Sequence, residues 1–243
     1  MNPVRVTLHV TKLAVRSIRL PGLDTFHQFL HRGWSATDRR RFLFRADREL
    51  HASKRYNVVS MLVTAPDPPD WSRITREEPG VFVELQERFA TWDLREGDAF
   101  CFKVRGHTAT QRLRPDVREA MDREDRRAPR GAPTYTHVAR THADRVAWLR
   151  ERFKGSGCEL LRTPEGETEA EPIVSNTVDS VVIKTQARKG GERIVVHGAD
   201  FDGCLVVTDP VRFADVLRSG LSGCDRRHLG CGLLSIRRVA TFG

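Results

Sequence analysis

Two histidines, His27 and His31, lie in a segment whose apolar residues recur at helical spacing. Residues four apart share one face of a helix, so the two imidazoles could form an acid–base pair. Asp24 stands where a helix N-cap belongs, which would place His27 at the third helical position. The positive end of a helix favours a neutral imidazole and attracts phosphate groups. The segment therefore indicates acid–base chemistry on a phosphate, with His27 as the main candidate.

Each of these residues also has an ordinary structural interpretation. A histidine beside Phe26 is commonly a core or surface residue, and His31 is by default a histidine on a helix surface. Asp24 is most simply a cap, although it could also orient His27. His31 and Asp24 are therefore supporting candidates only.

A second feature is a basic hairpin with a Gly-Gly tip. Strands are predicted at Ser180–Gln186 and Arg193–His197, on either side of the turn ARKGGE. Basic residues on a β-ribbon suit the phosphates that line the deep groove of an RNA duplex, whereas the alternative is a solvated hairpin tip. The candidate RNA-binding residues of this hairpin are Lys184, Arg188, Lys189 and Arg193.

A third feature is a glycine-rich loop near the C-terminus. It contains Arg226 and Arg227 and continues to Gly230 and Gly232. Successive backbone N–H groups in such a loop can bind an anion, and glycines permit close approach of a backbone. The loop is a second candidate RNA contact, or else a connection whose glycines only satisfy its geometry.

Composition narrows the functional classes. The 243 residues carry a formal charge of +9, which favours a polyanionic partner over a small neutral substrate. No apolar run approaches the ~20 residues of a membrane span, so we expect no membrane association. The N-terminal residues lack a signal-peptide core, which predicts a cytoplasmic protein. Five scattered cysteines do not make a disulfide framework.

Neither a metal nor a cofactor is expected. Cys224, His228 and Cys231 are close in sequence, but their spacing matches no common zinc signature. Phosphate-binding and dinucleotide-binding glycine motifs are absent from the sequence, as is a paired-histidine metalloprotease motif. No carboxylate cluster suggests a two-metal nuclease.

The chain alternates strands and helices in an order that can be read twice as strand–helix–strand–strand–helix–strand. This split βαβ pattern predicts an α+β protein of two tandem ferredoxin-like (RRM-like, βαββαβ) domains. The predicted strands are Val4–Ile18, Arg41–Ala46, Asn57–Thr64, Ala99–Arg105, Tyr135–Arg140, Glu159–Arg162, the two hairpin strands, Gly203–Thr208 and a last apolar strand. The predicted helices follow Asp24, span Glu78–Phe89, follow Thr141 as far as Phe153, and begin at Pro210.

A highly charged stretch divides the two copies. It holds almost nothing that could form a core, so it is interpreted as a linker or a frayed surface helix. We therefore predict an N-terminal domain at 1–112, a linker at 113–133 and a C-terminal domain at 134–243.

Three stretches, in their order and spacing, resemble the CRISPR repeat-processing endoribonucleases of the type I-E Cascade complex, the CasE family. They are Phe26-His27-Gln28-Phe29-Leu30, Arg145-Val146-Ala147-Trp148-Leu149 and Gly230-Cys231-Gly232-Leu233-Leu234-Ser235. Phe42-Leu43-Phe44 also falls at a familiar distance after the histidine. The resemblance covers nearly the whole chain.

The resemblance implies a metal-independent endoribonuclease that cuts CRISPR precursor RNA beside the repeat stem-loop. The 2′-hydroxyl would attack the adjacent phosphate, leaving a 2′,3′-cyclic phosphate and a 5′-hydroxyl, with His27 accepting or donating a proton. The product would stay bound inside the complex, so the implied partners are the repeat stem-loop and other Cascade subunits.

Two non-catalytic alternatives remain. The family often has Tyr at the position of Asp24, so the chain could be an RNA-binding Cascade subunit that does not cleave. It could also be a module of two RRM-like domains, although the strand AFCFKVR lacks the glycines of the RNP1 motif.

Overall fold

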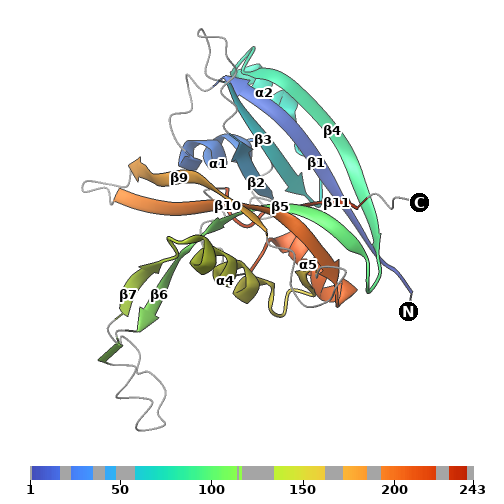
Figure 1. Cartoon of the computed structure of the whole chain (residues 1–243). Coiled ribbons are helices and arrows are strands. Elements are labelled where there is room, and N and C mark those ends of the chain that lie inside the picture. Colours follow the sequence, from blue (N-terminus) through green and yellow to red (C-terminus); the bar gives the residue numbers. More distant parts are fainter. Residues whose placement is uncertain are drawn as a thin grey trace.

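The computed structural model describes residues 2–16, 23–34, 42–47, 58–113, 115–116, 134–161, 172–184, 193–222 and 230–239. Two antiparallel sheets form its centre, and helices pack on each of them (Figure 1). Buried hydrophobic side chains from both sheets and their helices belong to one continuous core.

The N-terminal sheet has four strands in the spatial order β2-β3-β1-β4. Its strands are β1 (Val4–Arg16), β2 (Leu43–Asp47), β3 (Val58–Ala65) and β4 (Phe82–Leu94), and its helices are α1 (Leu23–His31) and α2 (Trp71–Glu77). Every second residue of β3 is buried, as expected for a strand with one covered face. In α1, Phe26, Phe29 and Leu30 supply the buried stripe.

The C-terminal sheet repeats this arrangement, with the spatial order β11-β5-β10-β8 and with β9 also paired to β10. Its strands are β5 (Ala99–His107), β8 (Cys158–Leu160), β9 (Ile173–Lys184), β10 (Arg193–Val207) and β11 (Leu234–Arg238), and its helices are α4 (His142–Phe153) and α5 (Pro210–Ser219). Thr141 forms a capping box with Asp144 at the start of α4, and Pro210 opens α5.

The helix predicted at Glu78–Phe89 is wrong. The helix lies earlier, in α2, where Asp70 caps the first turn and Trp71 and Ile74 are buried. Residues Phe82–Leu94 form β4 instead, paired along β1. The backbone pairing with β1 makes this segment a strand, although residues 83–89 are all exposed.

The predicted order of the second copy is also corrected. The strand expected there at Tyr135–Arg140 is β7 (Thr134–Val138), which pairs with β6 (Ala109–Leu113) in a separate ribbon that projects from the body (Figure 1). Its expected place is taken by β5, which pairs with β10 and β11. The charged composition after β6 suggested a domain boundary at that point. β5, which precedes it, was therefore assigned to the first sheet, because long-range strand pairing leaves no local signal in the sequence.

Two further boundaries differ from the sequence prediction. Arg193–His197 and Gly203–Thr208 were predicted as separate strands, but one long strand, β10, contains both up to Val207. Register shifts around Gly198 keep it paired with β9 from Arg193 to Asp202. β6 ends at Leu113, the first residue of the expected linker. The domain limits 1–112 and 134–243 stay a prediction.

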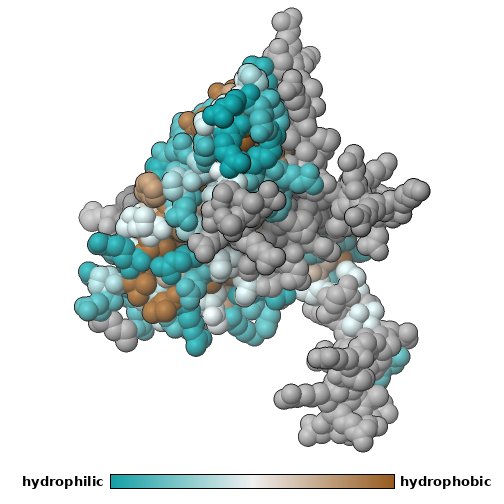
Figure 2. Space-filling view, turned by 180° about the vertical axis from the view of Figure 1, so that it is seen from behind, coloured by the Kyte–Doolittle hydropathy of each residue, from teal (hydrophilic) through white to brown (hydrophobic). Residues whose placement is uncertain are grey.

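The described surface in Figure 2 is mainly hydrophilic, with smaller hydrophobic areas between the polar ones. This agrees with a chain in which charged residues make up 30%. Among the described residues, the helices are too short or too polar to cross a bilayer.

Candidate active site

His27 lies in a cluster of aromatic rings between α1 and β2. Its partly buried ring stacks on Phe42, with ring centres 5.3 Å apart, and meets the edge of His31 at 4.3 Å. Trp34 stacks on the same Phe42 ring at 4.6 Å. The predicted spacing of His27 and His31 on one helix face therefore brings the two imidazoles together.

Asp24 does not cap α1. The helix begins at Leu23, so Asp24 lies inside its first turn and His27 is the fifth helical residue. The first four N–H groups of a helix lack an intrahelical partner, and the N–H of His27 comes after them. The structure therefore does not support the suggested capping bond between Asp24 and the His27 backbone. Contacts with neighbouring aromatic rings position the His27 imidazole instead. The Asp24 side chain lies outside the described residues.

The glycine-rich loop reaches the same cluster from the other end of the chain. A side-chain carbon at Gly230 would come within 3.3 Å of the Phe44 ring, whose centre is 6.2 Å from that of His27. Gly230 and Gly232 both have positive φ, at 79° and 89°, which glycine adopts without strain. The structure thus brings together His27 and the end of the glycine-rich loop, two features the sequence singled out separately.

Hydrogen bonds hold this loop in place. The N–H of Gly232 donates to the carbonyl of Arg105 on β5 at 2.8 Å, and its carbonyl accepts from Leu221 at 2.9 Å. The loop is therefore tied to β5 and to the segment after α5 rather than to α1.

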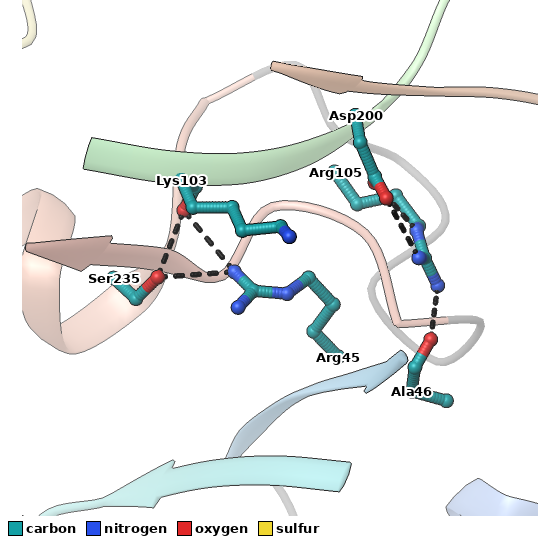
Figure 3. Close-up of polar contacts among 6 residues, drawn as sticks. All are labelled: Arg45, Ala46, Lys103, Arg105, Asp200 and Ser235. Carbon is teal, nitrogen blue, oxygen red and sulfur yellow. Dashed lines mark hydrogen bonds and ion pairs between the residues drawn. The ribbon is translucent and has the colours of Figure 1, made fainter. Parts of the chain in front are cut away.

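Arg45 joins β2 to the C-terminal sheet (Figure 3). Its buried guanidinium donates to the Lys103 carbonyl at 3.2 Å and to the Ser235 hydroxyl at 3.0 Å. Lys103 is on β5 and Ser235 on β11, so one side chain from the N-terminal sheet contacts two strands of the other.

Arg105 makes the reciprocal connection from β5 (Figure 3). It forms a two-pronged pair with Asp200 of β10, through Nε at 2.8 Å and Nη2 at 3.0 Å, and its Nη1 donates to the Ala46 carbonyl on β2. Both charged side chains are buried. These contacts fix β2, and with it the aromatic cluster, relative to the strand that holds Gly232. Sequence reasoning missed Arg45, Arg105 and Asp200, although Arg45 and Arg105 stand out as charges within apolar strands.

A model of the family described as CRISPR associated protein matches residues 3–238. The chain belongs to this family. The CRISPR-associated endoribonuclease Cse3 of Thermus thermophilus is 28% identical over 176 residues, 72% of each chain.

Solved structures resemble this CRISPR-associated protein over almost its whole length. Thermus thermophilus Cse3 bound to an RNA representing a pre-cleavage complex has a TM-score of 0.67 at 22% identity, covering 95% of this chain and 99% of that one. Cas6e of Escherichia coli K-12 has a TM-score of 0.61 at 17% identity, with 96% and 100% covered. Together with the two matching sheet orders, these likenesses confirm the predicted α+β fold of tandem ferredoxin-like domains.

The basic candidates of this CRISPR-associated protein are placed only in part. Lys184 and Arg193 face each other in the register of β9 and β10, where β9 ends and β10 begins. Their side chains, and residues Arg188, Lys189, Arg226 and Arg227, lie outside the described residues.

The three metal-ligand candidates, Cys224, His228 and Cys231, are also placed only in part. Cys231 is buried, whereas Cys224 and His228 fall outside the description. Within the described part of the chain, no group of three or more His, Cys, Asp or Glu side chains is arranged to hold a metal ion.

Proposed function

We propose that this CRISPR-associated protein is an endoribonuclease that cleaves CRISPR precursor RNA next to the repeat stem-loop. One observation carries the proposal: an imidazole in an aromatic cluster lies beside a glycine-rich loop, in a relative of the endoribonuclease Cse3. The imidazole supplies a group for proton transfer, and the loop lets an RNA backbone approach closely.

The proposed reaction uses the RNA as its own nucleophile. The 2′-hydroxyl oxygen forms a bond to the adjacent phosphorus, the bond to the 5′ oxygen breaks, and a 2′,3′-cyclic phosphate and a 5′-hydroxyl result. His27 accepts the proton of the 2′-hydroxyl or donates one to the leaving oxygen. His31, in ring contact with His27, is the supporting candidate, and Asp24, in the first turn of α1, is the second one.

RNA binding is proposed for the two basic features. Lys184 and Arg193, together with Arg188 and Lys189, would contact the phosphates of the stem, and a chain charge of +9 supports such contacts. Arg226 and Arg227, with Gly230 and Gly232, would contact the backbone near the cleaved bond. By its family resemblance, the protein keeps the cleaved RNA and works as a Cascade subunit in the cytoplasm.

Cleavage of a labelled repeat hairpin in EDTA tests the proposal. We expect cleavage without divalent metal and a product that ends in a 2′,3′-cyclic phosphate, because proton transfer by His27 requires no Lewis acid. A 2′-deoxy substitution at the cleaved nucleotide is the control and should abolish cleavage. If EDTA stops cleavage and Mg²⁺ restores it while the hairpin stays folded, the metal-independent mechanism is wrong.

A second candidate function is RNA binding without cleavage in the same type of complex. Asp24, where the family often has Tyr, favours it. Tight binding of the hairpin with no product under any condition would establish this function instead.

A further inference from the structure

Two thiols face each other on the C-terminal sheet, away from the aromatic cluster. Cys101 of β5 and Cys204 of β10 are direct partners in the register, and their sulfur atoms are 3.7 Å apart. Both are partly exposed. The neighbouring Phe100 and Phe102 are buried against Phe213 of α5 and Phe153 of α4, so Cys101 points to the face without these helices.

The backbone hydrogen bonds show which kind of pair this is. The carbonyl of Cys204 accepts from Leu161, on the β8 side of β10. The carbonyl of Val207, three residues further along, accepts from Gly97, on the β5 side. Backbone polar groups alternate between the two sides of a strand, so Cys204 and Cys101 form a pair without mutual backbone hydrogen bonds.

This geometry suits a disulfide that can be broken again. Pairs without mutual backbone hydrogen bonds have Cα atoms about 4.5 Å apart, close to the lower limit of about 4.4 Å for disulfides. A bridge at that limit is strained, and strained or exposed disulfides are reduced more easily than relaxed buried ones. The two sulfur atoms need to move together without any change of strand register.

The other described cysteines are poor competitors. Cys158 is 4% exposed, and burial raises the pKa of its thiol to about 12. Burial also raises the pKa of the Cys204 thiol, but that side chain is partly exposed to reagents in solution. Cys231 is 1% exposed. Partial exposure and a facing partner thus set Cys101 and Cys204 apart from these two.

We propose that Cys101 and Cys204 are a redox-modification site. Their two sulfur atoms form a reversible cross-strand disulfide by exchange with a small disulfide such as oxidised glutathione. One thiolate attacks the glutathione disulfide, forming a mixed disulfide and releasing one glutathione thiolate. The second thiolate attacks the protein sulfur of that mixed disulfide, forming the bridge and releasing the second glutathione. The two protein sulfurs are oxidised, glutathione disulfide is reduced, and both thiol protons go to solvent or to the departing thiolates.

The bridge would join the strands that carry Arg105 and Asp200. Both lie four residues from the cysteines, and Arg105 also anchors Gly232. Oxidation would therefore hold β5 against β10 beside the connection between the sheets. Hydrogen exchange of the β5 amides around Cys101 should slow when the bridge forms.

Native full-length protein exposed to oxidised glutathione tests the site. We expect its mass to fall by about 2 Da before alkylation, and alkylation in denaturant to label only three of its five cysteines. Digestion should yield a linked peptide pair containing Cys101 and Cys204. Dithiothreitol should restore both thiols. Cys101→Ser and Cys204→Ser should each keep a glutathione adduct, because the mixed disulfide has no partner to resolve it.

Two variants serve as matched controls. Cys158→Ser and Cys224→Ser should still form the bridge. The proposal is overturned if the mass of the wild type does not fall by about 2 Da, if the bridge still forms in Cys101→Ser, or if Cys224→Ser abolishes the bridge. These readouts do not depend on RNA cleavage, so failure here leaves the proposed function untouched, and the reverse also holds.

Discussion

Two arginine–aspartate pairs of similar geometry lie in different surroundings. Arg105 and Asp200 meet at 2.8 and 3.0 Å where β2 packs on the C-terminal sheet, and both side chains are buried. Arg5 and Asp93 meet at 2.7 and 3.2 Å across β1 and β4, where their side chains are 72% and 43% exposed. The β2 junction and the β1–β4 edge thus contain the same interaction in opposite environments.

The difference shows that geometry alone does not set the importance of an ion pair. At the edge, either charge is hydrated when its partner is lost, so the pair adds little to stability. In the junction, loss of one charge leaves the other buried without compensation. The junction also contains the aromatic cluster around His27. The buried Arg105–Asp200 pair, whose disruption is expected to destabilise the protein, therefore lies in the same region as the candidate catalytic histidine.

The largest effect is expected for Asp200→Asn. The buried Arg105 guanidinium loses its counter-charge, so the free energy of unfolding should fall by about 3–5 kcal/mol in urea titrations. Asp93→Asn is the matched control at the edge; its smaller effect should shrink further at high salt. Equal losses for the two variants would contradict the comparison.

The next effect is on catalysis in the junction. His27→Ala should lower the rate of RNA cleavage by about 10²-fold or more while RNA affinity stays nearly unchanged, because general acid–base catalysis contributes that much. His9→Gln removes a buried histidine from the β1–β4 edge and should leave the cleavage rate of bound RNA unchanged. Single-turnover cleavage at saturating protein measures both. A His27→Ala enzyme with full activity would move the active site elsewhere.

A smaller effect is expected for Gly230→Ala. Its φ of 79° is strained for alanine, and the new methyl group meets the Phe44 ring at 3.3 Å, so stability should fall by about 1–3 kcal/mol. Gly97, in the turn beside β5, has a φ of 84° but open space around it, so Gly97→Ala carries only the backbone strain. Thermal unfolding compares the two. If Gly97→Ala is the more damaging change, the close approach of the loop to Phe44 does not matter.

The smallest effect concerns pH at the edge. Burial lowers the pKa of His9, and the Glu87 carboxylate opposes that shift only in part. A histidine in the unfolded chain takes up a proton near pH 6.5, before the folded one does, so His9 reduces stability as the pH falls below about 6.5. Between pH 7.5 and 5.5, the Tm of His9→Gln should therefore fall less than that of the wild type. A steeper fall in the variant would reverse the sign of this contribution.

Local signals were read correctly where neighbouring residues decide the structure. Thr141 and Pro210 mark the starts of α4 and α5 because caps act within one helical turn. The alternation in β1 predicted a strand from Val4, and the helical spacing around His27 predicted α1. The observed start of α1 lies two residues before the predicted one, which removed Asp24 from the cap.

The errors have a common physical cause. β4 was predicted as a helix although Val83, Leu85 and Phe89 recur at even spacing, because these apolar residues are exposed rather than part of a core face. Its pairing with β1 makes it a strand. β5 was assigned to the first half because sequence order does not say which strands pair. The basic residues of the β9–β10 hairpin and the glycine-rich loop stay predictions at the level of side chains.

The sequence by itself determined the chemical groups of this CRISPR-associated protein: an imidazole pair on one helix face, basic segments, and glycines free to adopt positive φ. Only the tertiary structure decided that Gly230 meets Phe44 beside His27, and that Arg105 finds Asp200. The reason is that caps and periodicity act between neighbours in the chain. Buried ion pairs and the approach of a loop to a ring depend instead on how two sheets pack.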